Sequence, residues 1–542
     1  MTTRDRQLDG DISDPGANGS LGSPSRRDLL KAGGAVLGTL ALGRGALAQT
    51  PKAGGSIISA QNNEATGLDP QLVPSFSRSR RSPLTYSQLV RFDETMTIQP
   101  ELAESWTLSD DKLTWTFKLR QGVKFHDGQE LTSDDVKFTF ERLLEKSAGG
   151  KADFTALDKV EPAGKHQVKL VTKEPFAALL AALAGFWAYI VSEAGVKAGG
   201  GDLNKTAVGT GPFLLADWKV EQQMVFKKNP NYWKKGLPYV DEVVIRTIPD
   251  EANIVAALRA GQIHHAFIED NKNWNLLKDE KSLTGYRSSR LGYDYLNISA
   301  NRVNAPADKP WPLKDVRVRQ AISYAVDRSA ILRVAAAGFG RLTAPATGPM
   351  KQWQIPEDQW MKYYKPDLDK AKKLLADAGY PNGFSVKLCV IPTFPTMVNG
   401  APVVAANLKR IGINVEIENV EYAVWIKRWL AKDFDMTMNT TPGYGDPDTA
   451  FFRALHSTKG QNWNSSSPSD LDGMLEEGRR TFDQKRRKEI YDKVQIMILE
   501  QVPHLWLFSA DHIDFSQSYV KGWVQHPTTN LYGFERVWLD KA

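Results

Sequence analysis

The feature that most constrains the fold of this chain is a helix–strand–helix–strand pattern between residues 367 and 420. Asp367 precedes an amphipathic segment and Gly379 follows it, and these are residue types that begin and end helices. Residues 384–391 and 413–420 are predicted to form strands, with a helical apolar stripe between them. A single helix with short connections returns the chain to the same end of the sheet, so the two strands should be parallel. The pattern predicts an α/β fold.

A second unit is expected further toward the N-terminus. Residues 113–120 alternate between large apolar and polar side chains, which predicts a strand with one buried face. A helix should begin after Thr132, because Asp134 and Asp135 would then lie in its first turn, at the positive end of the helix dipole. With 542 residues, of which 42% are hydrophobic, the chain has material for several cores.

The first 48 residues have the pattern of an export signal. Arg26 and Arg27 precede a weakly apolar stretch, and Ala46 and Ala48 form a small-x-small cleavage site. Paired arginines before such a stretch are typical of the twin-arginine pathway, so we expect export in a folded state and cleavage after Ala48. An amphipathic helix or membrane anchor is the alternative, but a spanning helix needs about 20 apolar residues.

Two further features bear on the compartment. The apolar run 176–191 contains a glycine and a tyrosine and is short for a membrane span, so we expect a buried helix or a helix–strand passage. Cys389 is the only cysteine, which excludes an intramolecular disulfide, and its place in an apolar strand predicts an unreactive core side chain.

Motifs for catalysis, metals and nucleic acids are weak. Neither H-E-x-x-H nor G-x-S-x-G occurs, and the adjacent pair His264 and His265 would point to opposite faces of a strand. The short basic cluster at 78–81 lacks the repeated charge and interleaved aromatics of a nucleic-acid surface. The sequence therefore predicts neither an enzyme nor a resident metal or cofactor, and no nucleic-acid partner.

Three stretches together resemble the extracellular solute-binding proteins of family 5, which serve peptide/nickel-type ABC importers. They lie at 102–142, 315–349 and 364–435, and include Gly122-Val-Lys-Phe-His-Asp-Gly128 and Ile411-Gly-Ile-Asn-Val415. Shorter supporting motifs occur at 68–70, 209–213, 229–233 and 520–522.

This resemblance implies a type 2 periplasmic binding protein fold with two lobes, an inserted subdomain and a hinge. The expected boundaries are 52–95, 208–287 and 505–542 for the core of lobe I, 96–207 for the insert and 288–504 for lobe II. It also implies a periplasmic, monomeric protein that closes on a small-molecule or peptide ligand and presents it to ABC permease subunits. Export by the twin-arginine machinery adds one more partner.

The resemblance also shows where this chain departs from peptide binders. Peptide-binding members hold the ligand amine with an Asp before a Gly-Asp-Pro-like turn, and the matching position here is Gly443. Dipeptide binders also place an arginine on the ligand carboxylate, and no arginine occurs between Phe384 and Arg410. Because a buried ammonium without a carboxylate is costly, the expected ligands include opines and sugar conjugates beside peptides.

The candidate ligand-binding residues follow from placement within the family. Arg80 and Arg81 are expected to hold an anionic group, with surface exposure as the alternative. Trp187 is expected as a stacking wall or as a core residue. The remaining candidates, each with local architecture as its alternative role, are Ser77, Tyr444 and Asp446.

Three other functions stay open at this point. Capture of nickel or a metal chelate would need a histidine in the cleft, and His456 is the histidine nearest the loop of Tyr444 and Asp446. A secreted hydrolase is disfavoured by the missing motifs. A signalling module that docks on a receptor in its closed form would share the same fold.

Overall fold

The structure is a computed structural model, in which residues 51–542 form one compact unit. The predicted leader, residues 1–48 with Arg26, Arg27, Ala46 and Ala48, lies outside the described residues. The described residues are 50–72, 75–147, 149–305, 310–441, 443–461 and 469–541.

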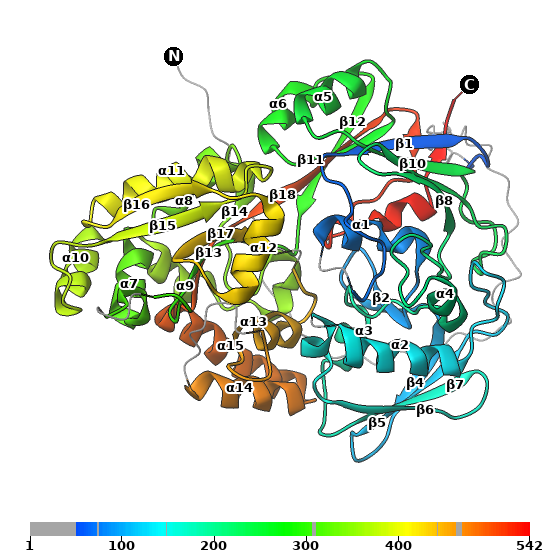
Figure 1. The fold of residues 1–542 in the computed structure, drawn as a ribbon, viewed down its shortest axis with the longest axis horizontal. Coiled ribbons are helices and arrows are strands. Elements are labelled where there is room, and N and C mark those ends of the chain that lie inside the picture. Colours follow the sequence, from blue (N-terminus) through cyan, green and yellow to red (C-terminus); the bar gives the residue numbers. More distant parts are fainter. Residues whose placement is uncertain are drawn as a thin grey trace, which may run out of the picture. The chain divides into compact units, whose positions relative to one another are not determined.

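A large mixed sheet runs through this unit (Figure 1). Its strand order is β16-β15-β17-β13-β18-β11-β1-β10-β9-β8, and β12 and β14 also pair with β18. The strands are β1 (Ser56–Gln61), β8 (Phe213–Lys219), β9 (Gln223–Lys228), β10 (Glu242–Thr247), β11 (His265–Ile268), β12 (Leu283–Ser289), β13 (Asp294–Ile298), β14 (Gly340–Arg341), β15 (Ser385–Val390), β16 (Asn414–Asn419), β17 (Met436–Thr440) and β18 (His504–Gln517).

The long strand β18 divides this sheet into two halves. Its residues from His504 to Phe508 pair with β13, which neighbours β17, β15 and β16, and we call this the second half. Its residues from Asp511 onward pair with β12 and β11, next to β1, β10, β9 and β8, and we call this the first half. The lobe boundary predicted at 504/505 thus falls at the start of a strand whose pairing with the second half continues for several residues.

The predicted parallel unit is confirmed in the second half. Strands β15 and β16 pair in parallel, and α11 (Pro395–Lys409) connects them. Helix α10 (Leu368–Asp377) begins after Asp367, whose carboxylate accepts a hydrogen bond from the backbone N–H of Lys370 at 2.9 Å. Gly379, just after the helix, has a φ of +92°, a conformation that glycine adopts without strain.

The second predicted unit is also confirmed. Strands β4 (Ala103–Leu108), β5 (Thr114–Leu119), β7 (Gln167–Thr172) and β6 (Leu157–Pro162) form an antiparallel sheet in that order. Trp115, Phe117 and Leu119 of β5 are buried. Helix α2 (Ser133–Lys146) begins with a capping box between Thr132 and Asp135, as the sequence predicts. We call this unit the insert; its predicted limits, 96–207, stay a prediction.

The apolar run 176–191 is a short helix followed by an irregular buried segment. Its helix is α3 (Leu179–Leu183), and Trp187 lies in the core of the insert. No helix among the described residues is long and apolar enough to span a membrane. The other helices and strands are α1 (Phe76–Thr85), α4 (Glu193–Ala198), α5 (Glu251–Arg259), α6 (Trp274–Leu277), α7 (Val316–Ala325), α8 (Arg328–Ala335), α9 (Glu357–Tyr364), α12 (Tyr422–Ala431), α13 (Arg453–Leu455), α14 (Ser469–Arg480), α15 (Gln484–Gln501), β2 (Val90–Phe92), β3 (Ile98–Pro100), β19 (Val520–Lys521) and β20 (Trp538–Leu539).

Candidate functional site: a cavity between the two halves

A cavity of about 220 Å³ lies between the two halves and the insert. The start of α1 supplies residues from the first half, the insert supplies three, and α12, β17 and α13 supply most of the rest. The lining residues are Ser75, Phe76, Ser79, Gly149, Phe186, Trp187, Tyr295, Ile391, Phe394, Met397, Tyr422, Trp425, Ile426, Trp429, Leu430, Asn439, Thr440, Thr441, Tyr444, Arg453 and Gln461.

One wall of the cavity is a row of aromatic rings on α12. Tyr422, Trp425 and Trp429 follow one another at helical spacing, so their side chains lie on the same face of the helix. The rings of Trp425 and Trp429 are 5.7 Å apart at an interplanar angle of 8°, and those of Tyr422 and Trp425 are 6.4 Å apart at 9°. The Trp425 indole donates a hydrogen bond to Thr437 Oγ1 at 2.7 Å, which fixes its orientation.

The second half contributes the only charged side chain among the described lining residues, Arg453. Its guanidinium donates to Asp153 Oδ1 and to the carbonyl of Gly149, both at 2.7 Å, and so joins the second half to the insert. Both side chains of the pair are 5% exposed. Burial by itself would lower the pKa of Arg453, but Asp153 and Tyr444 together outweigh burial and raise it. The arginine therefore stays charged, and the carboxylate of Asp153 balances its charge.

Trp187, predicted as a stacking wall, does line the cavity. Its ring lies 5.7 Å from the Arg453 guanidinium and 5.2 Å from the ring of Phe186. Gly149 packs directly against it, since a Cβ at that position would be 2.3 Å from the indole ring. Trp187 is thus both a core residue of the insert and part of the cavity wall, so the two roles expected from the sequence coincide.

Tyr444, the second predicted residue in the lining, lies at the same end of the cavity as Trp187 and Arg453. Its ring is 5.8 Å from Phe186, and the Arg453 guanidinium lies 5.9 Å from it. Burial raises the pKa of Tyr444 to about 12, although Arg453 opposes that shift. The phenol is therefore neutral at physiological pH and can donate or accept a hydrogen bond.

Helix α1 presents Ser75, Phe76 and Ser79 to the cavity, whereas Ser77 and Arg80 lie outside its lining. Ser77 Oγ donates to a backbone carbonyl at 2.8 Å. The Arg80 Nε donates to another carbonyl at 3.2 Å, and its guanidinium lies 3.6 Å from the centre of a phenylalanine ring. Both side chains are buried. The alternative prediction for Arg80, that it is exposed on the surface, is therefore wrong.

Arg81 also lies outside the lining and is buried. It donates to the carbonyl of Asn63 at 2.8 Å, and burial lowers its pKa to about 10. Contact of Ser77, Arg80 or Arg81 with a ligand stays a prediction. Their positions outside the cavity lining do not favour it.

Asp446 forms a buried bidentate pair with Arg487, with both oxygen–nitrogen distances at 2.7 Å. It lies outside the lining and fixes the turn after Tyr444. Gly443, nearby, has a φ of +82°, and a Cβ there would be 2.3 Å from the carbonyl carbon of Leu291. With this backbone, a side chain at position 443 would clash with Leu291, so residue 443 supplies no carboxylate for a ligand amine.

Sequence reasoning missed the aromatic wall on α12, Arg453, and the polar residues Asn439–Thr441 at the end of β17. The spacing of Tyr422, Trp425 and Trp429 is visible in the sequence and could have indicated a helix face rich in aromatic rings. Nothing in the sequence pattern indicates that Arg453 would meet Asp153, because 300 residues separate them.

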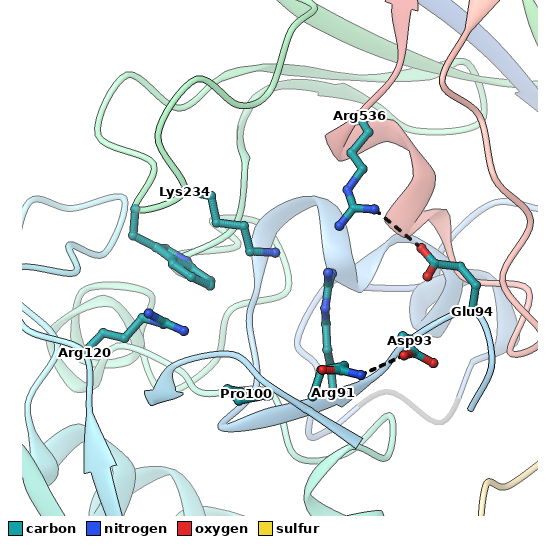
Figure 2. A pocket seen from close by; sticks show the side chains of 9 residues that line it. Arg91, Asp93, Glu94, Pro100, Arg120, Lys234 and Arg536 are labelled. Atoms are coloured by element: carbon teal, nitrogen blue, oxygen red, sulfur yellow. Dashed lines mark hydrogen bonds and ion pairs between the residues drawn. The ribbon is translucent and has the colours of Figure 1, made fainter. Parts of the chain in front are cut away.

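A second pocket, of about 580 Å³, lies entirely in the first half and the start of the insert (Figure 2). Six of its nine lining residues are charged, and they are paired with one another or with neighbours: Lys234 lies 2.6 Å from Glu535, and Arg536 lies 4.0 Å from Glu94. The Trp233 ring lies between Arg120 and Lys234. Among the described residues, the second half supplies none to this lining, so closure of the halves would not enclose a ligand in this pocket.

The described residues contain no group of three or more His, Cys, Asp or Glu side chains placed to hold a metal ion. His456, the histidine considered for metal capture, is buried outside the cavity lining, with its Nε2 3.3 Å from Glu476 Oε1. This position gives the metal-chelate alternative no support.

Comparison with known proteins identifies the fold and the family. The model of a family described as bacterial extracellular solute-binding proteins, family 5 middle, matches residues 97–462. Heme-binding protein A of Haemophilus influenzae is 32% identical over 498 residues, covering 85% of this chain and 88% of that protein. The dipeptide-binding protein of Escherichia coli is 29% identical, covering 93% of this chain and 98% of that protein.

Solved structures agree with these relatives. The periplasmic binding protein DppA from Helicobacter pylori, in complex with the peptide STSA, has a TM-score of 0.81 and 28% identity, covering 90% of this chain and 99% of that one. The binding protein AgaA from A. tumefaciens R10, in complex with agropinic acid, has a TM-score of 0.82 at the same identity and coverage. The predicted type 2 periplasmic binding protein fold is confirmed.

Proposed function

Because the chain belongs to the bacterial extracellular solute-binding proteins of family 5, we propose that it is the substrate-binding component of an ABC importer. It captures a small solute, such as a peptide, an opine or a related conjugate, and delivers it to the permease. The observation that carries this proposal is the cavity of about 220 Å³, which both halves and the insert line together. This is a family of binding proteins for transporters and not of enzymes.

The position of the cavity supplies a mechanism. A ligand that touches Phe76 on one side and Trp425 on the other gains contacts only when the two halves are close together. It therefore stabilises the closed form over the open one, and this difference in affinity is what shifts the population. The permease then has a distinct ligand-bound shape to recognise.

The ligand contacts in this proposal are the lining residues, with Trp187 and Tyr444 beside Arg453 at one end and the α12 rings along one wall. Asn439 and Thr441 offer further polar groups. In this proposal the protein acts as a monomer, because one chain supplies the whole lining.

Export completes the proposal. The pair Arg26 and Arg27 would direct the folded chain to the twin-arginine machinery, and cleavage after Ala48, at the Ala46-x-Ala48 site, would release it to the periplasm. Replacing both arginines with lysine should leave the uncleaved precursor in the cytoplasm. A mature protein that still reached the periplasm would contradict this route.

Closure and uptake test the function. X-ray scattering of the purified protein should give a smaller radius of gyration with its copurifying cargo than after that cargo is removed. A host strain that lacks this chain should lose uptake of the same compound and regain it on complementation. Superimposable scattering profiles together with unchanged uptake would overturn the proposed function.

A further inference from the structure

Two residues of the cavity lining each carry a buried nitrogen without a partner among the described residues, and both nitrogens are hydrogen-bond donors. Among the described residues, none accepts a hydrogen bond from Nε of Arg453 or from Nε1 of Trp187. As whole residues, Arg453 and Trp187 are 4% and 3% exposed, respectively. A buried donor without an acceptor costs about 1–3 kcal/mol, so an acceptor atom brought by a ligand would remove this cost at two neighbouring groups.

The described lining of the same cavity offers no carboxylate to balance a ligand cation. No Asp or Glu occurs among the described lining residues. Asp153, which lines a smaller adjoining pocket, is already bound by Arg453 at 2.7 Å. The undescribed segments that adjoin lining residues along the chain, 73–74, 148, 442 and 462–468, include no Asp or Glu. An ammonium group placed here would be buried without a counter-charge, at a cost of several kcal/mol.

The aromatic wall on α12 favours a ligand with a flat apolar surface. Trp425 and Trp429 present nearly parallel rings, and Ile391, Met397 and Leu430 add aliphatic side chains to the same lining. Aromatic rings stack in offset arrangements on such surfaces and gain about 0.5–1.5 kcal/mol beyond the burial of their area.

From these contacts we propose that the ligand is a planar aromatic or conjugated molecule that carries a carboxylate or carbonyl oxygen and no primary ammonium. Its ring system lies along the α12 rings, and its oxygen accepts hydrogen bonds from Arg453 and Trp187. The inference rests on the proposed function and narrows its ligand, because unmodified dipeptides carry the ammonium that this cavity cannot balance.

Calorimetry with three matched probes tests the ligand class. Indole-3-propionate carries the flat ring and the carboxylate, tryptamine replaces the carboxylate with an ammonium, and cyclohexanepropionate replaces the flat ring. We expect indole-3-propionate to bind about tenfold or more tightly than either of the others. Equal or tighter binding of tryptamine or cyclohexanepropionate would overturn the inference, as would absence of binding by all three or tighter binding of dialanine.

A conservative variant tests the donor. Trp187→Phe keeps an aromatic ring, although a smaller one, and removes the N–H, so affinity for indole-3-propionate should fall about five- to tenfold. Trp115→Phe is the matched control, because Trp115 is also buried in the core of the insert with an Nε1 that has no acceptor among the described residues, but it lies outside the cavity lining. Unchanged affinity in Trp187→Phe, or an equal loss in both variants, would contradict the proposed contact.

Identification of the bound compound tests this inference separately from the proposed function on which it rests. Native mass spectrometry of protein purified from its own host should show a bound aromatic acid or amide. An aliphatic or ammonium-bearing cargo that still closes the halves would overturn the ligand class and leave the transport function standing. Scattering that no cargo changes would instead count against the function.

Discussion

The cavity between the halves and the pocket of Figure 2 differ in size, in charge and in the parts of the chain that line them. The cavity is the smaller, about 220 Å³ against about 580 Å³, and one of its 21 described lining residues is charged, against six of nine in the other pocket. Yet only the cavity is lined from both halves. Volume therefore does not identify a binding site in a protein that works by closing; contributions from both sides do.

The two regions also use charge differently. Arg453 and Asp153 are buried together and connect two parts of the fold, so each depends on the other. Arg536 and Glu94, in the pocket of Figure 2, are 54% and 41% exposed, and water screens their attraction. The following variants test this contrast, beginning with the largest expected effect.

Replacing Arg453 with methionine should give the largest loss. Asp153 would remain buried without its cation, and we expect the free energy of unfolding to fall by about 3–5 kcal/mol in urea titrations. The double variant Arg453→Met/Asp153→Leu should recover most of that loss, because no buried charge is left uncompensated. A loss below about 1 kcal/mol in the single variant would show that the pair matters little.

Gly149→Ala should disturb the cavity wall next to that pair. The new methyl group would start 2.3 Å from the Trp187 ring, and moving the indole should cost about 1–3 kcal/mol of stability. Gly473→Ala is the control: Gly473 is an exposed position of α14 with no atom within 4 Å of an added Cβ, and the change should gain up to about 1 kcal/mol. Equal effects of the two changes would contradict the close packing at Gly149.

The pKa of Asp93, in the pocket of Figure 2, predicts that the stability of the protein depends on pH in the acid range. Burial would raise the pKa of Asp93, but hydrogen bonds from Thr97, Thr95 and Gln99 outweigh it and lower the pKa to about 2. As the pH falls, Asp93 takes up a proton in the unfolded state before it does so in the folded state. The stability that ionised Asp93 contributes is therefore present above about pH 4 and is lost as the pH falls through the folded pKa.

Asp93→Asn should therefore flatten the fall in unfolding free energy between about pH 4 and pH 2, measured by chemical denaturation at each pH. The exposed Asp110→Asn serves as the control and should keep the slope of the parent protein. An unchanged slope in Asp93→Asn would assign the acid sensitivity to other carboxylates.

The smallest effect is expected for Arg536→Ala. The Arg536 guanidinium is 4.0 Å from Glu94 and more than half exposed, so its removal should change stability by less than about 0.5 kcal/mol. Ligand affinity should not change either, because the second pocket is separate from the cavity. A loss of uptake in this variant would show that the contrast between the two regions is drawn wrongly.

Local patterns gave correct predictions where one segment determines its own structure. The caps at Asp367 and Thr132 and the alternation in β5 were visible in the sequence and are present in the structure. The structure also places Trp187, selected from the apolar run, and Tyr444, selected from the loop before Asp446, in the cavity lining, and their contact with a ligand stays a prediction. The same reasoning selected Arg80 and Arg81, because a sequence shows which helix nears the cleft but not which of its faces turns toward it.

Sequence by itself determined the parallel unit at 367–420, the strand and helix of the insert, and the family. The tertiary structure decided which side chains share a cavity, that Arg453 is neutralised by Asp153, and that β18 belongs to both halves. The physical reason is range. Caps and periodicity act over a few residues along the chain, whereas the balance of buried charges depends on groups that meet only after the chain has folded.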